Sequence, residues 1–179
     1  NAEVNIYELV TESNTSESFV EFLNTYPESS LQDTVWTLYY QKYISSYSKD
    51  RIMEFLDEYP STSNRESVET DIELCDSIYL PFVDEGVYGY MNSETETLIQ
   101  PGYESVSFFK EGLGIVSNNS KFGVINKQNK LLVPLIFDGI NSFENGIALV
   151  EKRGKVGLID RNGRFILDCI YNDIGTFSE

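Results

Sequence analysis

The feature that most constrains how this chain folds is a unit of about 34 residues that repeats along its second half. The unit begins near Gly86 and is read in three copies, most clearly in the segments 86–92, 121–126 and 155–160. Each segment carries an aromatic or aliphatic residue before a glycine and ends on Asn or Asp. A fixed period of this length indicates a repeat architecture, in which copies of one small unit stack into a continuous core.

Three short runs in each copy have the composition of β-strands and are separated by residues that favour turns. Asn and Gly between the runs tolerate the positive φ angles of tight hairpins. Each copy is therefore predicted to be an antiparallel three-stranded meander, which must stack on its neighbours to bury its apolar face. The first runs are 79–83, 113–117 and 147–151, the second are 88–92, 122–126 and 156–160, and the third are 97–100, 131–134 and 165–168.

Glycines and aromatic residues recur at the same offset and are conspicuous candidates for a binding site. We expect the glycines to permit close packing of neighbouring strands, although a ligand that approaches the backbone would impose the same requirement. We expect the aromatic residues to form the core between repeats, whereas a Tyr series facing solvent would make a ladder for glycan or peptide recognition. The glycines are Gly89, Gly123 and Gly157, and the aromatic series are Tyr103, Phe137 and Tyr171, and Phe109, Phe143 and Phe177.

Several short motifs agree at this one offset. They are Tyr88-Gly89, Phe122-Gly123 and Val156-Gly157; Val133-Pro134; Tyr103-Glu104 and Phe137-Asp138; and the Phe-x-x-Gly steps that start at Phe109 and Phe143. Residues 79–179 therefore resemble the bacterial WG-containing β-repeat family, with Tyr, Phe or Val in place of its signature Trp and Asp168-Cys169 where a proline is expected. The resemblance implies an all-β array that this chain holds only in part. A unit of ~34 residues is short for the ~40 to 45 residues of a propeller blade, which favours an open stack.

A second repeat, with a period of about 33 residues, occupies residues 15–78. Apolar residues at positions 19, 22, 23 and 26 return at 52, 55, 56 and 59, and this spacing predicts an amphipathic helix at the start of each copy. Thr15 and Ser48 are its expected N-caps. A second helix follows in each copy, with Ser30 expected to cap the first of these.

The motif Phe-Leu-x-x-Tyr-Pro ends the first helix of each copy, at residues 22–27 and 55–60. Residues 1–78 therefore resemble divergent tetratricopeptide-like repeats, and the resemblance implies an array of helical hairpins. An aromatic cluster on the predicted helix 31–47 is expected to pack between hairpins, and the alternative is a partly exposed peptide-binding face. Its members are Trp36, Tyr39, Tyr40, Tyr43 and Tyr47.

The charge of the chain limits its partners. The net charge is −16, and residues 1–80 carry 4 basic and 16 acidic side chains against 9 and 13 in residues 81–179. Binding to nucleic acid depends on basic side chains that release counterions, so we expect no nucleic-acid partner. No apolar run reaches the length of about 18 residues that predicts a transmembrane helix. The compartment stays open between the cytoplasm and an exported or envelope location, and Asn1-Ala2 is read as either a vector scar or a processed start.

Residues suited to catalysis or metal binding are few. The chain contains no His, and Cys75 and Cys169 have no metal-binding spacing. The two cysteines are expected to be small, partly buried hydrophobes, and a disulfide between them is the alternative. Asp138 with Glu144 could supply acid-base chemistry, but carboxylates at repeat spacing are better explained as turn residues. Residues 160–163 resemble the start of a calcium loop but are predicted to form a hairpin turn.

The sequence thus predicts an α+β chain with two regions, helical hairpin repeats over 1–78 and a β-repeat array over 79–179. No catalytic, cofactor-binding or metal-binding residue is predicted, and no binding residue is assigned. We expect a non-catalytic scaffold for protein–protein interaction rather than an enzyme. The alternatives are a cell-surface glycan-binding module and the regulatory part of a larger enzyme.

Overall fold

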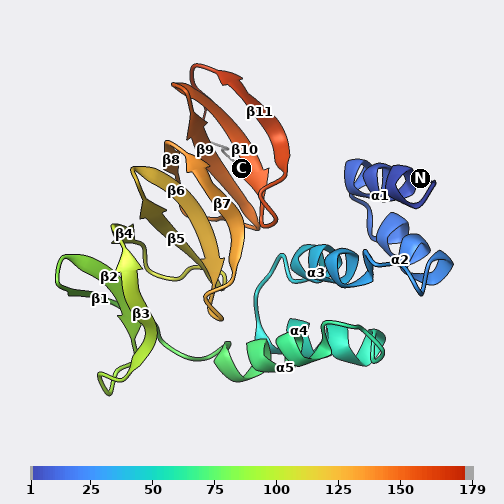
Figure 1. The fold of residues 1–179 in the computed structure, drawn as a ribbon, viewed down its shortest axis with the longest axis horizontal. Coiled ribbons are helices and arrows are strands. Elements are labelled where there is room, and N and C mark those ends of the chain that lie inside the picture. The colour runs from blue at the N-terminus through green and yellow to red at the C-terminus, as the bar shows by residue number, and fades with distance from the viewer. Residues whose placement is uncertain (1, 176–179) are drawn as a thin grey trace. The chain divides into compact units, whose positions relative to one another are not determined.

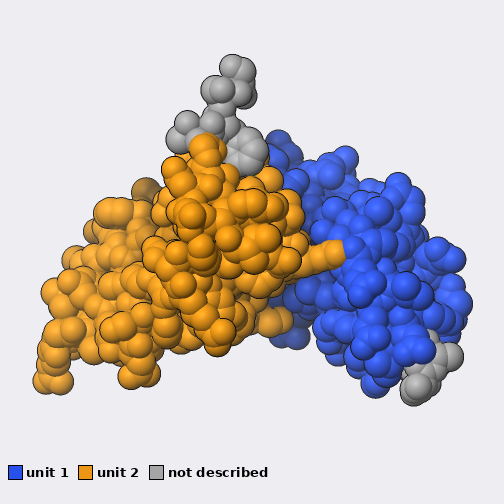
Figure 2. All heavy atoms as spheres, turned by 90° about the horizontal axis from the view of Figure 1, so that it is seen from above, with its two compact units in different colours: residues 1–72 blue, residues 73–179 orange. Residues whose placement is uncertain are grey.

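The computed structural model describes residues 2–175, and the fold is α+β with five helices followed by eleven strands in these residues (Figure 1). Contacts divide the chain into two compact units, residues 1–72 and residues 73–179 (Figure 2). The helices are α1 (Ala2–Ser13), α2 (Ser16–Thr25), α3 (Gln32–Tyr43), α4 (Lys49–Glu58) and α5 (Arg65–Leu74).

The helices begin largely where the sequence places their caps. The Thr15 hydroxyl accepts a 3.1 Å hydrogen bond from the Ser18 amide at the start of α2, and Ser48 caps α4 in the same way. The expected cap at Ser30 is wrong, because Leu31 is the residue that precedes α3 and no side chain caps it. The Ser29 hydroxyl instead accepts the Leu31 amide, so the chain makes a local turn before the helix begins.

The apolar spacing of the helical repeat is confirmed by burial. Phe19, Phe22 and Leu23 on α2 are buried, as are their counterparts on α4, Ile52, Phe55 and Leu56. The aromatic cluster splits into two parts, because Tyr39 and Tyr40 are buried whereas Trp36, Tyr43 and Tyr47 are half-buried. Two of the five residues are therefore core, as expected, and the other three stay partly accessible.

The strands form three antiparallel sheets. Their orders are β1–β2–β3, β4–β5–β6–β7 and β8–β9–β10–β11, so each sheet contains the predicted meander. The second and third sheets gain a fourth strand of two residues, which the sequence pattern did not predict. The bounds are β1 (Leu80–Asp84), β2 (Val87–Met91), β3 (Thr97–Tyr103), β4 (Ser105–Val106), β5 (Leu113–Asn118), β6 (Lys121–Asn126), β7 (Leu131–Phe137), β8 (Gly139–Ile140), β9 (Ile147–Lys152), β10 (Lys155–Asp160) and β11 (Phe165–Tyr171).

Local turn chemistry explains why the meander repeats. The loop between β1 and β2 has two residues with positive φ, Glu85 at 47° and Gly86 at 85°, as a tight hairpin of matching twist requires. After the second strand, the side-chain oxygen of Asn126 accepts the amides of Gln128 and Lys130 at 3.1 and 2.8 Å. Asn92 and Asp160 make the same pair of bonds one repeat to either side. Residues 160–163 are thus a hairpin turn, as predicted.

The recurring glycines are explained by close approach of the third strand. A Cβ on Gly123 would lie 2.6 Å from the Val133 carbonyl oxygen, at a register irregularity between β6 and β7. A Cβ on Gly89 or Gly157 would lie 2.4 or 2.5 Å from the carbonyl oxygen of Ile99 or Leu167. Backbone of the neighbouring strand therefore fills the space, and the alternative of a ligand at these glycines is wrong.

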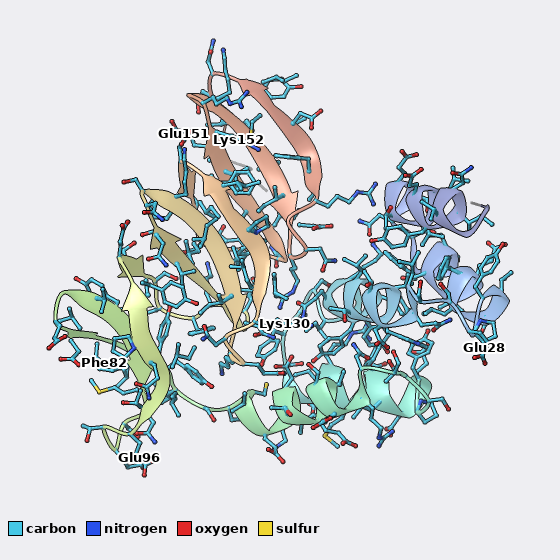
Figure 3. The ribbon with its side chains drawn as sticks, viewed as in Figure 1. Glu28, Phe82, Glu96, Lys130, Glu151 and Lys152 are labelled. Atoms are coloured by element: carbon cyan, nitrogen blue, oxygen red, sulfur yellow. The ribbon has the colours of Figure 1, made fainter. Side chains whose placement is uncertain are left out.

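The sheets stack face to face in chain order and form an open array. One core cluster joins Tyr79, Tyr90 and Ile99 of the first sheet region to Val116 and Ile125 of the second. A second cluster joins the second sheet to the third, and residue Lys152 at the end of β9 lies with its ammonium 5.6 Å from the centroid of the Phe137 ring (Figure 3). The members of this cluster are Leu113, Val124, Val133, Phe137, Phe143, Ala148, Val150 and Ile159.

The aromatic series belong mainly to these clusters. Phe137 and Phe143 are 1% exposed, and Tyr103 and Phe109 pack against the first cluster. Tyr171 is 41% exposed, and Phe177 lies outside the described residues. The interpretation of Tyr103, Phe137 and Tyr171 as a solvent-facing ladder is wrong, because Phe137, the central residue of the three, is part of the core.

Candidate binding groove

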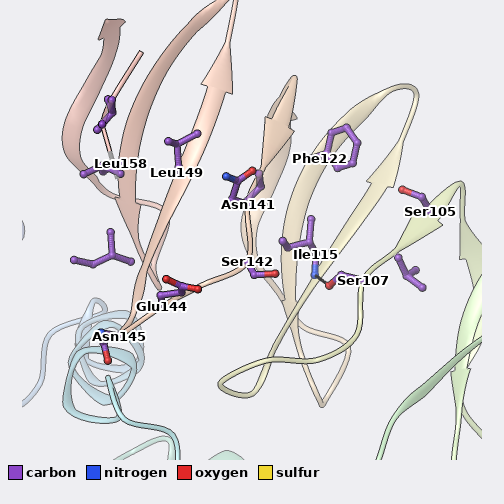
Figure 4. Close-up of a pocket in the computed structure, with 15 residues that line it drawn as sticks. Ser105, Ser107, Ile115, Phe122, Asn141, Ser142, Glu144, Asn145, Leu149 and Leu158 are labelled. Carbon is purple, nitrogen blue, oxygen red and sulfur yellow. Dashed lines mark hydrogen bonds between the residues drawn. The ribbon is translucent and has the colours of Figure 1, made fainter. Parts of the chain in front are cut away.

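A groove of about 1190 Å³ crosses the second and third sheets on the side where β4 and β8 lie (Figure 4). It is open rather than enclosed and is built mostly from strands. The residues that line it are Ser105, Val106, Ser107, Ile115, Phe122, Ile140, Asn141, Ser142, Glu144, Asn145, Ile147, Leu149, Leu158, Ile174 and Gly175.

The groove is built from positions that are equivalent in successive repeats. Ile115 on β5 and Leu149 on β9 occupy the same position of neighbouring repeats, and both line it. Val106, Ile140 and Ile174 form a second such series along the short strands and the segment after β11. The groove therefore follows the stacking direction, and each repeat contributes the same kind of wall.

Strand alternation gives the groove its apolar floor. Ile115 shares a face of β5 with Leu113, because side chains two residues apart point the same way. Leu149 lies opposite Leu158 across the β9–β10 pair, so the two side chains lie on the same face of the third sheet. Ile115 and Leu149 stay half-buried, and this apolar surface is accessible to a ligand.

Hydroxyl and amide groups form the polar part of the groove. The Ser107 hydroxyl accepts the Ile115 amide at 3.0 Å, and the Ser105 hydroxyl lies 2.7 Å from that of Ser117. Within residues 2–175, the side chains of Asn141 and Ser142 make no hydrogen bond. The backbone N–H of Asn141 donates to the backbone carbonyl of Leu149. Asn141 can therefore offer a ligand both a donor and an acceptor.

The two carboxylates suggested for acid-base chemistry, Glu144 and Asp138, are both engaged in ion pairs. The Glu144 carboxylate at the rim lies 3.1 Å from the Lys110 ammonium. Asp138, its suggested acid-base partner, accepts hydrogen bonds from the Lys121 ammonium and the Arg153 amide. These bonds, that from Lys121 above all, hold the pKa of Asp138 below its usual value. A carboxyl group with a lowered pKa is a poor general acid at neutral pH, so this environment does not favour that role for Asp138.

A smaller cleft of about 590 Å³ lies within residues 1–72. The Tyr43 and Tyr59 hydroxyls donate to the two oxygens of Glu58 at 2.8 and 2.7 Å, and the Arg51 guanidinium lies 3.8 Å from the centre of the Tyr43 ring. Burial, together with the bond to Glu58, raises the pKa of Tyr43 to about 12. The Tyr43 and Tyr59 phenols of this cleft are thus neutral at ordinary pH, and they hydrogen-bond to Glu58 within the cleft.

Residues 2–175 contain no group of three or more His, Cys, Asp or Glu side chains that could hold a metal ion. None of the helices described there is long and apolar enough to cross a membrane. Cys75 and Cys169 are half-buried thiols and do not form a disulfide with each other.

Sequence reasoning assigned no binding residue, so it missed the groove. The signal that was available is the equivalence of Ser107 with Asn141, polar residues that each follow an apolar residue of a short edge strand. Burial of these positions depends on how far one sheet covers the next. The alternation of residues within one strand does not contain that information.

The fold and its groove define a class of protein, an open stack of antiparallel β-meander repeats. The family model for the WG containing repeat matches residues 88–122, 122–155 and 157–179, which together make up about half of the chain. The chain belongs to the WG containing repeat family, and the resemblance drawn from its motifs is confirmed. No curated protein and no solved structure matches the chain.

Proposed function

We propose that this chain is a non-catalytic interaction scaffold from a bacterial protein and that its groove binds an extended segment of another protein. The observation that carries the proposal is the pairing of an apolar floor, Ile115 and Leu149, with the unengaged side chains of Asn141 and Ser142. Extended peptides are recognised in this manner, by apolar pockets together with a few polar groups that fix their direction.

The size of the groove favours a peptide over a small molecule. Its volume of about 1190 Å³ is above the range of roughly 300–1,000 Å³ that is usual for small-molecule pockets. Its walls repeat along the stack, which suits a ligand that is itself extended. The lack of His and the lowered pKa of Asp138 support a role other than catalysis.

The helical unit is proposed to be a tetratricopeptide-like array of hairpins that offers a second protein-binding surface. Its five helices and the repeated burial of Phe22 and Phe55 support this assignment. Glycan binding is the weaker alternative, because the aromatic series that motivated it contains the buried Phe137. A regulatory role in a larger enzyme would use the same grooves. The sequence of the full-length protein would test this alternative.

Selection of peptides from a random display library against the whole chain tests the groove. We expect enriched peptides whose affinity falls at least tenfold in Leu149→Glu, because a carboxylate on the apolar floor must be desolvated when the peptide binds. Asn141→Ala should weaken the same peptides by about fivefold through loss of a hydrogen bond worth about 1 kcal/mol.

Val83→Glu is the matched control, since Val83 is an exposed apolar residue of β1 that does not line the groove. Urea unfolding of all three variants checks that each folds. An empty selection, or peptides that bind Leu149→Glu as tightly as they bind the unchanged chain, would remove the proposal.

A further inference from the structure

The strand β11 has exposed apolar side chains, and no other strand in the described part of the chain pairs with its outer edge. It is the last strand of the third sheet, at the edge opposite to β8 (Figure 1). None of its residues lines the groove. Four of its seven residues are exposed large hydrophobics: Phe165, Ile166, Ile170 and Tyr171, at 36%, 53%, 65% and 41%. Ile170 is equivalent to Ile136, which is likewise exposed, at 42%, whereas Tyr171 is equivalent to Phe137, which the neighbouring sheet buries.

Of the equivalent strands, β7 is protected where β11 is not. β3 and β7 are also edge strands. Pro134 lies on β7, whereas Pro101 of β3 stands one residue out of register with it and its nitrogen faces Gly89 of β2. Proline lacks the amide hydrogen that a neighbouring strand would bind, and it is a common means of blocking an edge. β11 contains no proline, and Asp168 stands at the position of Pro134.

Other features of β11 do not distinguish it from β7. Both strands pair with their inner neighbour through a register irregularity opposite the recurring glycine, Gly157 or Gly123. Both are seven residues long. The difference between an open and a blocked edge is therefore the proline.

We infer that β11 is a docking edge for an extended strand of a partner protein, which adds to the third sheet by main-chain pairing and carries a basic residue next to Asp168. The Asp168 side chain is exposed, and within residues 2–175 it has no ion-pair partner. A strand that brings Lys or Arg beside it gains a favourable cross-strand charge pair. The exposed isoleucines on either side, Ile166 and Ile170, select apolar residues flanking that cation.

A second copy of this chain fits the edge less well. Asp168 is the central residue of β11, so antiparallel pairing of two copies about the strand centre would place one Asp168 opposite the other. Like charges directly opposite each other destabilise a strand pair. The single added strand also makes a small interface, which suits a transient partner.

The test uses the whole chain and a synthetic seven-residue peptide in which Val and Thr alternate around a central Lys, matching the length of β11. Binding is followed by fluorescence anisotropy, with a peptide carrying central Glu for comparison. We expect the Lys peptide to bind at least tenfold more tightly than the Glu peptide. Asp168→Pro should weaken the Lys peptide at least tenfold, whereas Val83→Glu on β1, outside both the groove and β11, should leave its affinity unchanged.

Asp168→Pro gives β11 the residue that β7 already has at this position, so the sheet is expected to tolerate it. The matched control is Gln100→Pro, the same change at the equivalent position of β3. If Asp168→Pro fails to fold, Asp168→Lys keeps the amide and should reverse the preference from the Lys peptide to the Glu peptide. Absence of binding, equal binding by Asp168→Pro, or dimerisation through β11 seen by analytical ultracentrifugation would each overturn the inference.

Discussion

The Nη1 atom of Arg161 donates a 2.9 Å hydrogen bond to the carbonyl oxygen of Glu111. The same contact exists one repeat earlier, where the Lys127 ammonium donates to the carbonyl oxygen of Ser77 at 2.8 Å. Both basic residues are buried, at 3% and 8% exposure, and each directly follows the Asn or Asp whose side chain closes its turn. In these two turns a buried cation thus links the turn to the backbone one repeat earlier.

Replacement of Arg161 should weaken the stack. In Arg161→Met the Glu111 carbonyl loses this donor, and we expect the free energy of unfolding to fall by about 1–3 kcal/mol, the cost of an unpaired buried polar group. Arg161→Lys should lose less, because Lys serves at the equivalent position 127. Urea unfolding measures both, and equal stability of Arg161→Met and the unchanged chain would show that the contact does not stabilise the stack.

The glycine opposite the third strand should be intolerant of any side chain. In Gly123→Ala the new Cβ would lie 2.6 Å from the Val133 carbonyl oxygen, and the atoms it meets all belong to the backbone. We expect the free energy of unfolding to fall by about 3 kcal/mol or more, because strands β6 and β7 must move apart. This is the upper end of the cost of overpacking a site.

Gly102→Ala is the control for this change, since a Cβ there meets no heavy atom within 4 Å. Its effect on the thermal unfolding midpoint should be close to zero. If both variants unfolded at the same temperature, close strand approach would not be the reason for glycine at position 123.

Stability should fall at alkaline pH through the phenol cluster of the helical unit. Burial and the bond to Glu58 raise the pKa of Tyr43 from 10.0 to about 12, so the folded state favours the neutral phenol. A raised folded-state pKa contributes stability that is fully present below the unfolded-state pKa near 10 and is lost as the pH rises towards 12.

Tyr43→Phe removes this titration, and its unfolding free energy should decline less between pH 10 and 12 than that of the unchanged chain. The absorbance of tyrosinate during an alkaline titration of the folded protein gives a second measure. The variant should lack one late-titrating phenol, while those of Tyr59, Tyr90 and Tyr103, whose pKa values are also raised, remain. An identical decline in both proteins would show that Tyr43 ionises as an ordinary phenol.

Much of the local structure follows from the sequence because the interactions responsible lie within a few residues. The Asn126 turn is closed by amides two and four residues ahead, and the hairpin at Glu85 and Gly86 needs only positive φ angles. The helix cap at Thr15 is equally local, whereas the Ser30 cap failed because Ser29 competes for the backbone next to it. The family follows from the same local motifs at one offset.

The sequence by itself therefore determined the period, the turns, the glycines and the order of helices and strands. Only the tertiary structure decided that β4 and β8 join their sheets, because a strand of two residues has no alternation and pairs only when its partner is in place. It also decided which equivalent residues are core and which are open, such as buried Phe137 and exposed Tyr171. The physical reason is that a residue's burial depends on the sheet stacked above it, and this neighbour is set by contacts across repeats and not by the residues beside it in the chain.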